Sequence, residues 1–120
     1  RGDALAASER ARELAETLIR EERADPWTFW EFAQAGLLAG RIEQARNQPD
    51  AARLHWARVL AVLTPRLTVT PNDWRYLDPV AQACVLTGQT EQARPLIERL
   101  RGFGYRPLDP LAASTLGVAR

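Results

Sequence analysis

Residues 40–59 read GRIEQARNQPDAARLHWARV, and residues 81–100 read AQACVLTGQTEQARPLIERL. In both stretches a small residue is followed, at steps of twelve, four and three, by an alanine and two larger apolar residues. The aligned positions are Gly40, Ala52, Trp56 and Val59 in the first stretch and Ala81, Ala93, Ile97 and Leu100 in the second. Small residues let the two helices of a hairpin touch, and larger residues fill the space against the next hairpin. The spacing therefore predicts two helical hairpins of one kind.

Helical periodicity continues on both sides of these stretches. Residues 3–23 carry apolar residues at three- and four-residue steps, which predicts an amphipathic helix. Asp25-Pro26 then favours a new helix, because proline suits the first helical position after an aspartate cap. No segment alternates apolar and polar residues in the manner of a strand, so we expect an all-α chain. The further expected helices cover residues 26–46, 50–63 and 91–102.

Two features within the expected helices predict local departures. Gly36 and Gly40 lie four residues apart and lower helix propensity, so we expect a neighbouring helix to approach closely there. Pro79 follows Asp78, and a proline inside a helix costs about 3 kcal/mol. We therefore expect a short turn at 71–76 and a helix that begins at Pro79 and ends near residue 87. Residues 64–73 are expected to form the longest connection.

The repeated spacing resembles that of the tetratricopeptide repeat. Gly40 and Ala81 match its small position, Ala52 and Ala93 match its alanine, and Gly88 matches its turn glycine. The resemblance implies antiparallel helical hairpins stacked as a short solenoid within a single domain, 1–105, followed by a tail, 106–120. The implied units are a half-repeat, 3–23, and two repeats, 26–63 and 71–102. Asn47 replaces the turn glycine of the first repeat, and the repeats are offset by 41 residues rather than the roughly 34 of the family.

The resemblance also implies a partner-binding groove lined by the first helix of each repeat. The groove positions carried over are Gln34, Leu37, Arg41, Gln44, Arg75, Asp78, Gln82 and Val85. This set is polar with little net charge, so we expect a protein–protein interaction or scaffolding module that binds a peptide or a partner domain. The alternative is a regulatory or structural segment of a larger bacterial enzyme or signalling protein, packed against its neighbouring domain.

Composition limits the classes of partner. Of 120 residues 46% are apolar and 26% charged, as in globular domains, and the net charge of +1 argues against a nucleic-acid partner. No apolar run approaches the roughly 18 residues of a membrane span, so we expect no membrane contact. Cys84 is the only cysteine, which excludes an internal disulfide and fits a cytoplasmic location. The absence of Met predicts that the chain is a piece of a longer polypeptide, and its ending is similar to the last repeat of bacterial multidomain proteins.

Residues capable of chemistry are few. His55 and Cys84 are single and have no obvious catalytic partner in sequence, so we expect no enzyme, no cofactor and no metal site. Trp27 and Trp30 lie three apart at a helix start and could stack on a ligand, whereas Trp56 occupies a repeat core position. The exposed side of the helix over residues 3–23 carries Leu14 and Leu18, through which we expect weak homodimerisation.

Overall fold

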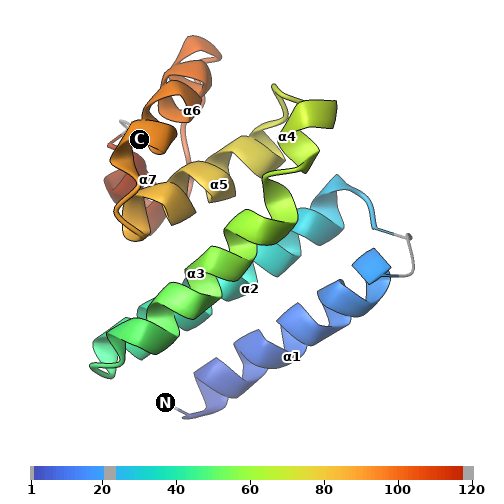
Figure 1. The fold of residues 1–120 in the computed structure, drawn as a ribbon, viewed down its shortest axis with the longest axis vertical. Coiled ribbons are helices and arrows are strands. Elements are labelled where there is room, and N and C mark those ends of the chain that lie inside the picture. The colour runs from blue at the N-terminus through green and yellow to red at the C-terminus, as the bar shows by residue number, and fades with distance from the viewer. Residues whose placement is uncertain (1, 21–23, 118–120) are drawn as a thin grey trace.

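The computed structural model describes residues 2–20 and 24–117 as helices joined by short turns, with no strand in these ranges (Figure 1). The all-α prediction is therefore confirmed for the described residues. Seven helices are found there: α1 (Gly2–Arg20), α2 (Pro26–Ala45), α3 (Pro49–Leu63), α4 (Arg66–Val69), α5 (Trp74–Leu86), α6 (Thr90–Gly102) and α7 (Pro110–Leu116). The end of the helix expected over residues 3–23 lies outside the described residues.

The helices pack around α2 and α5. In Figure 1, α2 lies behind α3, α1 packs against α2, and α5 crosses beside the far end of this group. Helices α2 and α3 form one antiparallel hairpin, and α5 and α6 form another. Both α2 and α3 contact α5, while α7 returns to pack against α5. The two hairpins therefore share one core, in which Phe32, Val59 and Tyr76 are buried.

Short polar residues determine where several helices begin and end. The Asp25 carboxylate accepts a hydrogen bond from the Thr28 amide at 2.9 Å and caps α2. Asp73 and Asp109 cap α5 and α7 in the same way. The turns of the two hairpins each contain one residue with positive φ, Asn47 at 66° and Gly88 at 81°. Asn47 can replace the expected turn glycine because asparagine tolerates the left-handed conformation better than most residues.

Close helix approach at the two glycines is confirmed. A Cβ atom added at Gly40 would lie 2.1 Å from Trp56 Nε1, and one added at Gly36 would lie 2.7 Å from Val59 Cγ2. The Trp56 indole covers the Gly40 backbone and donates a hydrogen bond to the Leu37 carbonyl at 3.3 Å. The absence of side chains on α2 thus makes room for the largest side chain of α3.

The turn expected at 71–76 is shorter than predicted, because only residues 71 and 72 form a turn before the helix begins. Helix α5 begins at Trp74 and runs through Pro79, which is buried inside it. The local cost of the proline is a missing hydrogen bond, whereas the first turn of α5 buries Tyr76 and Leu77 completely. Tertiary burial and the Asp73 cap therefore outweigh the local penalty. The connection expected at 64–73 also contains the four-residue helix α4.

The C-terminal segment belongs to the packed structure as far as it is described. Helix α7 buries Ala112, Ala113 and Leu116, and Leu116 joins a cluster with Leu77 and Leu100 of the second hairpin. With only seven residues and a proline at its start, α7 is too short to produce a clear helical period in sequence. Its packing places the segment between residues 105 and 117 over one side of α5.

Candidate binding site

Helix α2 carries a stripe formed by Trp30, Gln34 and Leu38, which are spaced by one helical turn. Hollows open on both sides of this stripe. The first, between α1 and α2, has a volume of about 510 Å³ and is walled mainly by small residues of α1 such as Ala4, Ala7 and Ala11. We call it the α1–α2 trough. The second lies between α2, α5 and residues 105–112 and has a volume of about 460 Å³. We call it the aromatic pocket.

Three aromatic rings form the walls of the aromatic pocket. The rings of Trp30 and Trp74 meet edge to face with centroids 5.2 Å apart, and the Trp74 and Tyr105 rings lie 5.5 Å apart. Trp27 extends this group, because its ring lies 5.8 Å from that of Trp74. Pro107 and Leu108 complete the apolar lining from the C-terminal segment. Such a hollow, largely apolar with few polar groups, is typical of ligand sites.

The floor of the aromatic pocket is polar. Asp78 and Gln82 are only 1% and 3% exposed, and the Gln82 side-chain amide donates to Asp78 Oδ1 at 2.5 Å. The Tyr105 hydroxyl donates to the other carboxylate oxygen, Oδ2. Burial raises the pKa of Asp78 above its ordinary value, while the two hydrogen bonds act in the opposite direction. Burial, and then the charge of Asp78, raise the pKa of Tyr105, so its hydroxyl remains a donor.

Exposed apolar side chains border the site. Leu108 is 93% exposed, and the side chains of Trp27, Leu38 and Leu111 are about half exposed. Leu38 lines the α1–α2 trough, and Leu38 and Leu111 line a small hollow of about 50 Å³ that also contains Gln34. Gln34 thus lies at the centre of a face with apolar groups on several sides. Contiguous exposed apolar groups of this kind mark interaction surfaces.

The predicted groove residues fall into two sets. Three of them, Gln34, Asp78 and Gln82, meet in the aromatic pocket, although they come from two different helices, α2 and α5. Leu37 is buried, and Arg41 lines the small hollow and donates to the Thr115 hydroxyl of α7 at 2.6 Å. The C-terminal segment therefore covers part of the expected groove.

The remaining groove residues lie away from the aromatic pocket. Gln44 is exposed near the end of α2, and Val85 packs against the main core. Arg75 is held by Asp73, with an Nη2–Oδ2 distance of 2.9 Å, and its guanidinium lies 5.0 Å from the centroid of the Trp27 ring.

Several residues of the aromatic pocket were not predicted from the sequence. Trp74 belongs to the segment expected as a turn, and Tyr105, Leu108 and Asp109 belong to the segment treated as a boundary and tail. One signal was present in the sequence, because Leu108 is an apolar residue among prolines and an aspartate. No periodicity connected that signal to α2 or α5.

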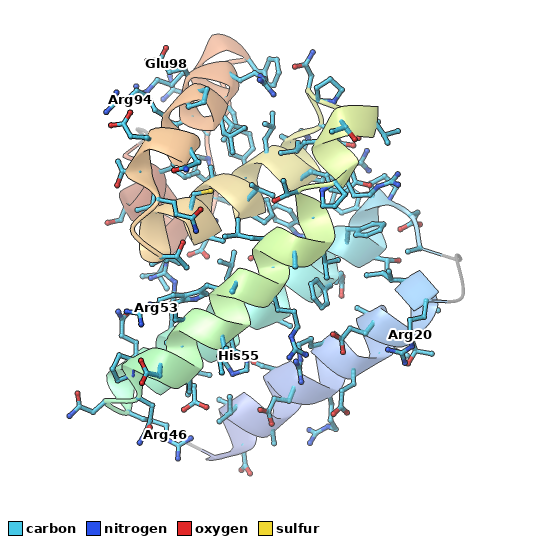
Figure 2. All side chains as sticks on the ribbon, in the orientation of Figure 1. Arg20, Arg46, Arg53, His55, Arg94 and Glu98 are labelled. Carbon is cyan, nitrogen blue, oxygen red and sulfur yellow. The ribbon has the colours of Figure 1, made fainter. Side chains whose placement is uncertain are left out.

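His55 lies between α3 and α1 and is half-buried (Figure 2). Its Nε2 is 4.0 Å from Glu43 Oε2. Burial, and then the charge of Arg12, lower the pKa of His55, while Glu43 and Glu9 oppose this shift. His55 is therefore neutral near pH 7 and has no role in the aromatic pocket.

Cys84 is buried, and burial raises the pKa of its thiol, which disfavours the reactive thiolate. Within residues 2–20 and 24–117, no three His, Cys, Asp or Glu side chains are grouped so that they could hold a metal ion. None of the helices described is long and apolar enough to cross a membrane.

Comparison with known proteins gives no relative from which a role could be transferred. No protein-family model, no curated protein and no solved structure matches this chain.

Proposed function

We propose that this chain is a protein–protein interaction module of the tetratricopeptide type that binds a partner segment across the face centred on Gln34. The observation that carries the proposal is the aromatic pocket, a hollow of about 460 Å³ bordered by exposed apolar side chains. Binding energy at protein interfaces concentrates where one side chain enters a desolvated pocket, and aromatic residues dominate such positions. The pocket can accept an anchoring side chain, and the surrounding apolar groups can exclude water.

The topology supports the same proposal. Helices α2 and α5 contact each other, and their hairpin partners α3 and α6 follow them in the same order. The stacked hairpins of helical repeats present the first helix of each unit to the partner. Here Gln34 lies on α2 and Asp78 on α5, the first helices of the two hairpins, and both residues line one pocket.

A library of random peptides displayed on phage tests the proposal. We expect peptides to be enriched on the wild-type protein and to lose at least about tenfold in affinity when Trp30 is replaced by alanine, as for a hot-spot contact. Arg53→Ala is the matched control, because Arg53 points outward from α3 and is largely exposed (Figure 2). Failure to enrich any peptide, or equal binding to the Trp30→Ala variant, would contradict the proposal.

A weak homodimer through α1 is a second proposal with its own observation. Leu14 is 65% exposed and continues a line of exposed small residues formed by Ala4, Ala7 and Ala11, whereas Leu18, the other predicted contact, is partly buried. Sedimentation velocity over a concentration series should show reversible self-association that Leu14→Glu abolishes. Leu54→Glu is the matched control, since Leu54 of α3 is equally exposed. A wild-type protein that stays monomeric at the highest concentration excludes the dimer.

A further inference from the structure

The carboxylate of Asp78 is buried and accepts two hydrogen bonds within the described part of the chain. Its two hydrogen-bond donors, Gln82 and Tyr105, are both neutral. No ion pair found among the described residues includes Asp78, and the one charged group that shifts its pKa is Asp109, which has the same sign. Carboxylates buried to this extent in proteins are normally paired with a cation. A positively charged ligand group at the floor of the aromatic pocket would therefore stabilise the ionised carboxylate of Asp78.

Two basic residues near the pocket are held by partners of their own. Arg41 donates to Thr115 of α7, and Arg75 is held by Asp73 and the Trp27 ring. Arg106 lines the pocket and makes an interaction of its own. The carboxylates that line the same hollow are Asp78 and Asp109.

The aromatic rings that form the walls of the pocket also favour a cation. The face of an aromatic ring attracts a guanidinium or ammonium group within about 6 Å of its centroid. This protein already uses the interaction nearby, because Arg66 lies over Phe29 at 5.3 Å and Arg75 lies over Trp27 at 5.0 Å. Trp30, Trp74 and Tyr105 offer three further rings around the hollow.

We propose that the aromatic pocket binds the side chain of an arginine in the partner, with the guanidinium directed toward Asp78 and the aliphatic stem against the rings. The inference rests on the proposed function and names the anchor that this function requires. Guanidinium is favoured over ammonium because it is planar, stacks on aromatic rings and is weakly hydrated. The Gln34 amide can assist, since its Nε2 is buried and no partner for it is found in the described part of the chain. Turning the amide would present Oε1 to a guanidinium N–H without breaking a hydrogen bond of Nε2.

The test uses three blocked amino acids as probes: N-acetyl-arginine amide, N-acetyl-citrulline amide and N-acetyl-norleucine amide. Citrulline has nearly the same shape as arginine without its charge, and norleucine retains only an apolar chain. Titration calorimetry measures affinity, and the indole N–H signals of Trp30 and Trp74 locate the probe by NMR. We expect the arginine probe to bind at least about tenfold more tightly than the citrulline probe, as a desolvated cation–π and charge contact requires.

Variants separate the charge of Asp78 from the shape of the pocket. Asp78→Asn should remove the preference for arginine over citrulline, whereas Asp50→Asn should leave it unchanged, because the Asp50 side chain is 98% exposed in α3. Trp74→Leu removes one aromatic ring from the pocket and leaves Asp78 unchanged. This variant should weaken arginine binding by about tenfold. Since Trp74 is partly exposed, this variant keeps the inference testable if Asp78→Asn does not fold.

Several outcomes would overturn the inference. Equal binding of the arginine and norleucine probes would show that the pocket takes an apolar side chain, which removes the inference and leaves the interaction module in place. Absence of arginine binding, or retained preference in both Asp78→Asn and Trp74→Leu, removes it as well. Agmatine, the free amine with the same guanidinium, completes the series. If agmatine binds about tenfold more tightly than blocked arginine, the ligand is a small amine rather than a peptide side chain.

Discussion

The two hairpins use the same register with different side chains. In the α2/α3 hairpin, Gly36 and Gly40 face Val59 and Trp56, so the bulk comes from the second helix. At the equivalent positions, 41 residues later, the α5/α6 hairpin has Leu77 and Ala81 on its first helix, and Ile97 packs against their cluster. The volume that Trp56 supplies in one hairpin is divided between Leu77 and Ile97 in the other.

This difference shows what the repeat preserves. The alanines Ala52 and Ala93 are both fully buried at the contact of each hairpin, and the turn residues Asn47 and Gly88 share a positive φ. Register and turn geometry are therefore common to the two units, while the sizes of facing side chains compensate each other. Compensation of this kind keeps the core close-packed when single positions change. Substitutions of the same kind should therefore change the free energy of unfolding by different amounts in the two hairpins.

The largest effect is expected for Gly40→Ala. The new Cβ would lie 2.1 Å from Nε1 and 2.5 Å from Cε2 of Trp56, a rigid ring that is almost fully buried. Overpacking should outweigh the gain in helix propensity and lower the free energy of unfolding by about 2–3 kcal/mol. Urea denaturation followed by circular dichroism measures the change. Unchanged stability would mean that α2 and α3 do not approach as closely as described.

Ala93→Leu should have the next largest effect. Ala93 is fully buried between α6 and the core, so the added atoms have no free space. We expect a loss of about 1–3 kcal/mol in the free energy of unfolding. Ala57→Leu is a suitable control because Ala57 is exposed on α3. Equal stability of the two variants would contradict the register assigned to the second hairpin.

Gly36→Ala should be milder than Gly40→Ala. The added Cβ would meet Val59 Cγ2 at 2.7 Å, which is one terminal methyl group rather than a fused ring. The clash is partly offset by helix propensity, so we expect a net loss of about 1 kcal/mol or less. Chemical denaturation of Gly36→Ala and of the double variant with Val59→Ala tests this reasoning. The cost of the Gly36 substitution should disappear in the Val59→Ala background.

Gly102→Ala should have the smallest effect and the opposite sign. Gly102 is the last residue of α6, and an added Cβ would meet nothing within 4 Å. Alanine should therefore stabilise the protein by about 0.5 kcal/mol through helix propensity. A melting temperature below that of the wild type would show that Gly102 has a conformational role that the contacts do not reveal.

Most of the fold could be predicted from local patterns. Apolar periodicity predicted the long helices, and the glycine pair predicted that a neighbouring helix approaches closely at Gly36 and Gly40. The prediction failed at Pro79, because a local rule gives the cost of a proline but not the burial of Tyr76 and Leu77 that offsets it. Helix α7 was not delimited either, since seven residues are too few to establish a period.

The candidate site was predicted only in part. The resemblance to the tetratricopeptide repeat predicted Gln34, Asp78 and Gln82 as groove residues, and these three line one pocket. Only the tertiary structure decided that Trp74, Tyr105 and Leu108 join them, and that α7 covers Arg41. The physical reason is the range of the interactions. Helix periodicity and close helix approach depend on residues only a few helical turns apart in sequence. The packing of residues 105–117 against α5 depends instead on apolar surface that the two packed hairpins leave uncovered.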